Sequence, residues 1–307
     1  MAVASKYGLI YFMLLIMGTG LVGCGEKQTE NTPQSLTGAS TTKSSPLSSA
    51  TPPLSPNSAI TRAISGPDDA IVETQYFYSG PREPRPEDEV DSEASHGKTA
   101  YLTFDDGPSQ STKRILDILK SFHIPATFFV IGSDTTEGRA LYKQIVAEGH
   151  ALGNHSYSHD YNTIYKSPEA FRKDVRKLDR LLEETVGFRP DILRFPGGSN
   201  NHLSRKAGGR SIMSRVASAM REDGYQYVDW NVSSTDAAAP VQDKNMIIDS
   251  VIGASKGKQN IIVLMHDNTY KTTTVEALPI VIKRLQAAGF RFAKLTKFSY
   301  TFQFLTT

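Results

Sequence analysis

Residues 100–131 read AYLTFDDGPSQSTKRILDILKSFHIPATFFVI. This segment begins and ends with short apolar runs, Ala100–Phe104 and Ala126–Ile131, and their length and composition predict buried strands. Between these runs, Ser111–Phe122 has its apolar residues at helical spacing, which predicts an amphipathic helix. A strand, a helix and a second strand in this order predict one unit in which the two strands lie parallel.

The same alternation continues to the end of the chain, and glycine or proline marks many of the joins. It predicts an α/β fold with a parallel sheet, either closed as an imperfect barrel or open as a doubly wound sheet. Polar residues at the carboxyl ends of the strands favour the barrel, because α/β barrels build their sites on that rim. The further predicted strands are Ala151–Asn154, Ile192–Phe195, Tyr225–Trp230, Ile261–Met265 and Arg291–Leu295. The further predicted helices are Gly138–Glu148, Pro168–Thr185, Ile212–Asp223, Lys244–Ala254 and Thr273–Ala288.

Charge and cysteine content exclude some classes of protein. The chain has 307 residues and a formal net charge of +2, so it lacks the strong basic field that gathers nucleic acid. Its single cysteine, Cys24, leaves no partner for an intramolecular disulfide. We therefore expect a domain that is stabilised by its hydrophobic core alone, with no nucleic-acid partner.

The N-terminus has the features of an export signal. Lys6 precedes an apolar run over residues 8–22, which ends in Leu-Val-Gly-Cys at residues 21–24. These four residues resemble the lipobox of bacterial lipoproteins, so residues 1–24 are predicted to be a lipoprotein signal peptide with Cys24 as the lipidated residue. The alternative is an ordinary signal peptide or an uncleaved anchor in which the cysteine is incidental. The first interpretation places the protein outside the cytoplasm, held on the membrane by its lipid.

Residues 25–96 are predicted to be a linker. Serine, threonine and proline dominate residues 26–58, which have too few large apolar residues to form a core, so disorder is expected there. Residues 60–95 are more mixed and acidic, and their structure is left open. The catalytic domain is expected to span residues 97–307.

Paired carboxylates and paired histidines follow two of the predicted strands. Asp105 and Asp106 end the first strand, where neighbouring side chains point different ways, so that one can bind a cation and the other can face a reacting group. His155 and His159 follow the third strand, and a spacing of four on a helical turn would let both rings reach one metal ion. Taken alone, Asp-Asp-Gly-Pro is more often a solvated turn, and the histidine spacing also arises by coincidence.

Further candidate residues follow the later strands. Arg194 ends the fourth strand, where a guanidinium can hold a carboxylate ionised, and Gly197 leaves a backbone N–H accessible to an oxyanion. Trp230 and Asp236 follow the fifth strand, and His266 ends the sixth, where it could act as a general acid. Each of these residues also has an ordinary structural interpretation. Arg194 could be a surface arginine, Trp230 a core residue, Asp236 a loop residue and His266 a buried structural histidine.

Together, these motifs resemble the five signature motifs of the polysaccharide deacetylase family, also called the NodB-homology family or carbohydrate esterase family 4. The resemblance extends from Lys98 to Leu295. It implies a distorted (β/α)₇ barrel and a hydrolase that removes acetyl groups from chitin, peptidoglycan, xylan or exopolysaccharide, typically with zinc or cobalt.

The resemblance also implies a role for each residue. Asp105 would be the general base, oriented by Arg194, and His266 the general acid, tuned by Asp236. The metal ligands would be Asp106, His155 and His159. The N–H of Gly197 would bind the oxyanion, Leu264 would line the acetyl pocket, and Trp230 is taken as a candidate substrate-facing residue. Many relatives have an aromatic residue at the position of Gly197 and a tryptophan at that of Ala237, so the wall of the groove is expected to differ here.

The resulting hypothesis is a monomeric, membrane-tethered enzyme that deacetylates N-acetylglucosamine in peptidoglycan. The nearest alternative is a deacetylase or esterase acting on chitin-like oligomers, xylan or exopolysaccharide. A glycan-binding lipoprotein without turnover is a second alternative, although no base or ligand is lost. The two-histidine, one-carboxylate set also serves iron oxygenases, but the paired aspartates, Arg194 and His266 favour hydrolysis.

Overall fold

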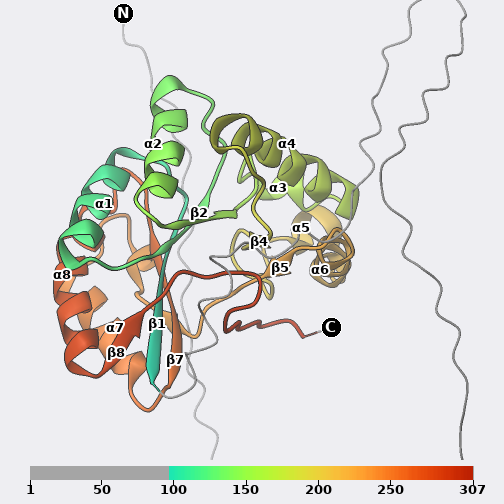
Figure 1. Cartoon of the computed structure of the whole chain (residues 1–307). Coiled ribbons are helices and arrows are strands. Elements are labelled where there is room, and N and C mark those ends of the chain that lie inside the picture. The colour runs from blue at the N-terminus through green and yellow to red at the C-terminus, as the bar shows by residue number, and fades with distance from the viewer. Residues whose placement is uncertain (1–96, 307) are drawn as a thin grey trace, which may run out of the picture. The chain divides into compact units, whose positions relative to one another are not determined.

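The computed structural model describes residues 97–306, which Figure 1 colours from blue-green to red. The predicted signal peptide, the predicted lipidation of Cys24 and the predicted linker lie outside the described residues. Within residues 97–306, no helix is both long enough and apolar enough to cross a membrane.

Strands and helices alternate along this part of the chain. The strands are β1 (Lys98–Asp105), β2 (Thr127–Val130), β3 (Ala151–Asn154), β4 (Ile192–Leu193), β5 (Gln226–Tyr227), β6 (Val232–Ser233), β7 (Asn260–His266) and β8 (Phe290–Phe292). The helices are α1 (Gln110–Phe122), α2 (Thr136–Ala147), α3 (Tyr161–Ile164), α4 (Pro168–Val186), α5 (Arg205–Gly208), α6 (Ile212–Glu222), the 3₁₀ turn η2 (Asp236–Ala238), α7 (Lys244–Ser255) and α8 (Thr272–Ala287). The predicted helices correspond to α1, α2, α4, α6, α7 and α8.

The strands form one parallel sheet in the order β5-β4-β3-β2-β1-β7-β6. β8 pairs with the first residues of β1, while β2 pairs with its last residues. The edge strands β5 and β6 are joined by residues 228–231 alone, so the sheet must curl until its edges approach each other. The result is an incomplete barrel with helices packed around its outside (Figure 1), which confirms the predicted distorted (β/α)₇ architecture.

The strand predictions are wrong at three places, one of which is the last predicted strand, Arg291–Leu295, because the structure has β8 at Phe290–Phe292. The run Tyr225–Trp230 forms only the two-residue β5, and the chain then forms a separate short strand, β6, that was not predicted. The physical reason lies in residue 229, because the backbone N–H of Asp229 donates to the carbonyl of Phe302 (2.8 Å) rather than continuing the pairing with β4. The fourth predicted strand is also short, with only Ile192 and Leu193 in β4.

The alternation of side chains along β1 divides the core into two parts. Ala100, Leu102 and Phe104 face outward and pack into the large cluster beneath the surrounding helices. Tyr101 faces inward and packs with a smaller cluster that includes Ile262. Because side chains alternate along a strand, the residues further along the inward face of β1 point into the barrel, and the last of them is a carboxylate.

The C-terminal segment, defined as residues 302–305, occupies the seam between β5 and β6. The carbonyl of Phe302 accepts from the N–H of Asp229, and the N–H of Phe304 donates to the Asp229 carboxylate (2.8 Å). The N–H of Leu305 donates to the hydroxyl of Ser199 (3.0 Å). The last described residues of the chain therefore fasten the barrel at the residues that lead from β5 toward β6.

Candidate metal centre and catalytic site

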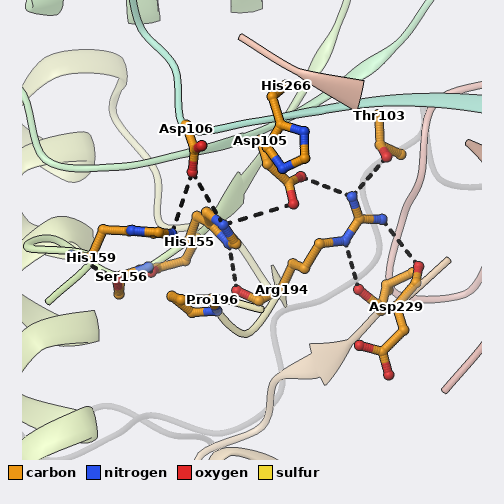
Figure 2. Close-up of polar contacts among 12 residues, drawn as sticks. Thr103, Asp105, Asp106, His155, Ser156, His159, Arg194, Pro196, Asp229 and His266 are labelled. Carbon is orange, nitrogen blue, oxygen red and sulfur yellow. Dashed lines mark hydrogen bonds and ion pairs between the residues drawn. The ribbon is translucent and has the colours of Figure 1, made fainter. Parts of the chain in front are cut away.

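The candidate residues meet at the carboxyl ends of the strands. Asp105 ends β1, His155 directly follows β3, Arg194 directly follows β4, and His266 ends β7. Figure 2 shows their side chains converging on one space, with Asp106 above the two histidines. This juxtaposition of segments far apart in the sequence is the one that the barrel prediction requires.

The two adjacent aspartates are held in different environments by a tight turn. Asp105 is buried in the sheet, whereas Asp106 is partly exposed and has a positive φ of 74°. The N–H of Asp267 donates to the carbonyl of Asp105 (2.7 Å), and the N–H of Ile131 donates to that of Gly107 (2.8 Å). These backbone bonds fix the turn, so that one carboxylate lies inside the barrel and the other lies over its mouth.

Asp106, His155 and His159 form a cluster of metal-ligating atoms, all within 4.8 Å of one another. The Nε2 atoms of His155 and His159 lie 3.6 and 3.4 Å from Oδ1 of Asp106. Ligands bound tetrahedrally to zinc at about 2.0–2.1 Å are about 3.3 Å apart, so the cluster is close to the required size. One carboxylate and two imidazoles also leave coordination positions for water and substrate, and the donor set therefore fits a divalent ion.

The protonation of His155 suits a metal ligand. Its Nδ1 lies 2.8 Å from the carbonyl oxygen of Arg194, which can only accept, so Nδ1 carries the proton and Nε2 is left with a lone pair facing Asp106. Burial lowers the pKa of His155 to about 3, with the neighbouring His159 adding to the effect. The imidazole therefore stays neutral, as coordination requires.

His155 and His159 were predicted to lie on a helical turn, and this prediction is wrong, although the two rings do lie close together. Residues 155–159 form a loop outside any helix, in which Ser156 and His159 have positive φ values of 68° and 52°. Side chains replace the helical hydrogen bonds: the Asp174 carboxylate accepts from the N–H groups of Tyr157 (2.6 Å) and Ser158 (3.0 Å). The ring centroids of the two histidines are 5.2 Å apart in this loop.

Asp105 forms a buried ion pair with Arg194, whose side chain is fully enclosed. The Arg194 guanidinium donates to Oδ1 of Asp105 (2.8 Å) and to the hydroxyl of Thr103 (2.7 Å). Its other N–H groups donate to the carbonyls of Val228 (2.9 Å) and Asp229 (3.0 Å). Burial raises the pKa of the Asp105 carboxyl, and the guanidinium opposes that rise. Asp105 is thus held in one orientation, with Oδ2 3.7 Å from Nε2 of His155.

His266 forms the second buried ion pair, with Asp236. Nδ1 of His266 lies 2.7 Å from Oδ1 of Asp236, and Oδ2 accepts from the backbone N–H of His266 (2.8 Å) and the hydroxyl of Thr274 (3.0 Å). Burial alone would lower the pKa of His266, but the Asp236 carboxylate outweighs it and raises the pKa to about 9. At neutral pH the ring is therefore cationic and able to donate a proton.

Gly197 lies in the turn that follows Arg194, next to the Tyr161 hydroxyl. Its φ of 79° belongs to the left-handed region that favours glycine. Ser199 anchors the turn, since its N–H and hydroxyl both donate to the Asp229 carboxylate (2.8 and 2.5 Å). Among residues 97–306, none accepts a hydrogen bond from the N–H of Gly197. That donor is free for a ligand.

Comparison with known proteins agrees with this arrangement. The family model for polysaccharide deacetylases matches residues 92–227. A peptidoglycan-N-acetylglucosamine deacetylase of Bacillus cereus is 32% identical over 198 residues, which cover 64% of this chain and 68% of the relative. This chain belongs to the polysaccharide deacetylase family.

Solved structures resemble this polysaccharide deacetylase in fold as well. The catalytic domain of a peptidoglycan N-acetylglucosamine deacetylase from Eubacterium rectale has a TM-score of 0.65 and 34% identity, covering 69% of this chain and 95% of that domain. A CE4 esterase from Streptococcus mutans has a TM-score of 0.58 and 31% identity, covering 66% of this chain and 87% of the esterase. The family is generally metal-dependent, in keeping with the donor cluster described above.

Trp230 of this polysaccharide deacetylase lies on the seam of the barrel. Its ring packs edge-on against Phe304 (centroids 5.0 Å apart) and lies close to Gly198. It also lines a cavity of about 620 Å³, whose other walls include Tyr300 and Asn260. The predicted contact of Trp230 with substrate stays a prediction.

Three polar residues that shape the site were not among the residues predicted from the sequence. Asp229 anchors Ser199, Asp174 shapes the histidine loop, and Tyr161 packs its ring against His159 (centroids 5.6 Å apart). An aspartate inside the apolar run Tyr225–Trp230 was a usable signal, because a buried carboxylate requires donors. Asp174 and Tyr161 gave no such signal, because they reach the site through the path of the loop rather than through any spacing.

Proposed function

We propose that this chain is an extracytoplasmic, metal-dependent deacetylase that removes N-acetyl groups from N-acetylglucosamine in peptidoglycan. The observation that carries the proposal is the convergence of the Asp106, His155 and His159 donors next to the buried Asp105–Arg194 pair. Hydrolysis of an amide needs an electrophile, a base and an acid, and this rim offers a candidate for each.

The proposed ligands Asp106, His155 and His159 would hold zinc, or alternatively cobalt. When bound there, such an ion polarises the acetyl carbonyl and lowers the pKa of its bound water toward about 7. The neutral, tautomerically fixed His155 and the open coordination positions support this assignment.

Asp105 is the proposed general base. Its buried carboxylate takes the proton of the attacking water, and Arg194 keeps it oriented and limits the rise of its pKa. His266 is the proposed general acid, which gives its proton to the leaving amine while Asp236 holds the opposite nitrogen. In this assignment the reaction starts with Asp105 deprotonated and His266 protonated.

Gly197 and Leu264 are the proposed contacts for the acetyl group. The unpaired N–H of Gly197 donates to the oxygen that gains charge as water adds to the carbonyl. Leu264 lies two residues before His266 on β7, so both side chains face the same side of the strand. This places an apolar side chain beside the acid, where it suits the acetyl methyl.

The choice of peptidoglycan rests on relatives named for that substrate and on the predicted tether. A lipid on Cys24 and a linker over residues 25–96 would let a monomeric domain, residues 97–307, reach the wall from the membrane. Freed amines would add positive charge to the glycan. These assignments follow from the sequence and the likeness to relatives.

Acetate release tests the proposal. The purified chain is incubated with peptidoglycan, chitooligosaccharides and acetylated xylan, before and after chelation and after addition of zinc or cobalt. We expect release from peptidoglycan that is lost on chelation and restored by metal. No release from any N-acetylated glycan under metal-replete conditions would contradict the proposal, and preferential release from xylan would reassign the substrate.

Two variants separate metal binding from proton transfer. Asp105→Asn should retain one bound ion but lose at least about a hundredfold in kcat, because the amide cannot take up a proton. His155→Ala should lose both the ion and turnover, because one ligand is removed. Asp117→Asn, in an exposed pair with Lys113 on α1, is the control and should match the parent enzyme.

A further inference from the structure

The Tyr161 hydroxyl lies against the turn that contains Gly197. The Cβ atom of any side chain at position 197 would lie only 2.6 Å from the Tyr161 hydroxyl. Cβ lies about 2.5 Å from its own backbone nitrogen, so the hydroxyl lies within about 5 Å of the Gly197 nitrogen. Two donors that share one oxygen acceptor at about 2.9 Å are at most about 5.8 Å apart. The spacing therefore permits both groups to reach one oxygen atom.

The ring of Tyr161 is held firmly in this position. It packs edge-on between His159 and Tyr165, with both centroid distances at 5.6 Å. The Tyr165 hydroxyl donates to the carbonyl of Pro196 (2.8 Å), which is the residue before Gly197. The same stack of aromatic rings thus positions Tyr161 against a proposed metal ligand and against the turn.

The Tyr161 hydroxyl has no hydrogen-bond partner within residues 97–306. Tyr161 is only half-buried, so it is open to a ligand. A phenol keeps its proton at neutral pH and is able to donate it. Beside it, the N–H of Gly197 also has no acceptor among residues 97–306. Two unpaired donors thus lie within about 5 Å of each other, next to the proposed ligand His159, and this is a suitable place for a negatively charged oxygen.

We propose that the Tyr161 hydroxyl is a second oxyanion donor, which binds the acetyl oxygen together with the Gly197 amide. The inference rests on the proposed deacetylase function and adds a residue to it. When water adds to the acetyl carbon, the carbonyl π electrons move to the oxygen, and the charge on that oxygen receives both hydrogen bonds. The hydroxyl keeps its own proton throughout, so the proton balance of the reaction is unchanged.

Tyr161→Phe tests this role, because it keeps the ring and removes only the donor. We expect kcat to fall by about 100- to 1000-fold with KM within about threefold, as for the loss of one oxyanion donor. Acetate, the reaction product, should bind the zinc-loaded enzyme at least about fivefold more weakly by calorimetry, with unchanged zinc content. Asp117→Asn, the exposed substitution on α1, is again the control and should change neither quantity.

The outcomes separate this inference from the proposed function. Unchanged kcat and acetate affinity in Tyr161→Phe, with an active parent enzyme, would overturn the donor role alone. Loss of zinc from the variant would also overturn it, since the hydroxyl would then act through His159. A parent enzyme that neither deacetylates glycans nor binds acetate would overturn both proposals.

A double-mutant cycle tests the same contact in a second way. Gly197→Ala pushes its methyl group into the Tyr161 hydroxyl, so its cost in kcat should be smaller in the Tyr161→Phe background, where that atom is missing. Additive effects on kcat would show that the hydroxyl and the turn do not act together and would contradict the proposal.

Discussion

At the scale of single residues, the site contains two buried ion pairs, one with the proposed base and one with the proposed acid. Burial and the partner's charge shift the pKa in opposite directions in both pairs, and a different one of them prevails in each. In the Asp105–Arg194 pair, burial prevails and raises the pKa of the carboxyl. In the His266–Asp236 pair, the carboxylate prevails and raises the pKa of the imidazole. A base that is not too weak and an acid that is still charged at neutral pH are the states that amide hydrolysis needs.

The His266 pair predicts the alkaline side of the pH profile. Because the ring donates only when protonated, kcat should fall as pH rises through about 9. Asp236→Asn removes the charge that raises this pKa, so the fall should move to lower pH by at least about one unit. Steady-state rates between pH 5 and pH 10 measure both profiles.

Asp249→Asn is the control for that measurement. Asp249 is exposed on α7 and paired with Arg284, so its replacement should leave the profile unchanged. An alkaline limb at the same pH in Asp236→Asn and the parent would show that His266 is not the titrating donor.

At the scale of elements, the histidine loop matters more than any helix around the site. Sequence periodicity predicted the long helices and the central strands because their apolar faces repeat over many residues. It failed at β4, β5 and β6, which are only two residues long. The pairing of His155 with His159 was predicted correctly, but its basis is a loop held by Asp174, and no spacing rule encodes such a conformation.

Asp174 therefore gives a prediction of its own. Asp174→Ala removes the acceptor of two backbone N–H groups in the loop, so the two histidines should be less well aligned. We expect zinc affinity to fall by about 10- to 100-fold, as for other residues that support metal ligands. Competition with a chromophoric chelator measures it.

Lys177 offers a matched control on the same helix, because it contacts the loop only through the face of the Tyr157 ring (3.6 Å). Lys177→Ala should change zinc affinity by less than about threefold. Equal affinity in Asp174→Ala and the parent would mean that the loop keeps its shape without the carboxylate.

At the scale of the whole catalytic domain, the C-terminal segment holds Asp229 and Ser199 in place at one edge of the barrel. Deleting residues 301–307 removes the bonds from this segment to Asp229 and Ser199 and leaves a buried carboxylate with fewer donors. We expect a fall in Tm of several degrees and a loss of kcat, because Asp229 also anchors the turn that contains Gly197.

The shorter deletion of residues 306–307 keeps every one of those bonds and serves as the reference. It should retain the Tm and kcat of the parent, measured by thermal denaturation and acetate release. Equal Tm and kcat in the two deletion variants would show that the C-terminal segment does not stabilise this edge of the barrel.

The place of β1 at the centre of the sheet has a consequence for how the enzyme matures. β1 ends in Asp105 and leads directly into Asp106, yet its long partner β7 is made more than 150 residues later, and β8 later still. Contacts between such distant segments make folding slow, since a long loop must close before they form. The ribosome therefore makes more than 150 further residues before β1 can pair with β7, and the active centre, which needs His266 at the end of β7, matures only after that point.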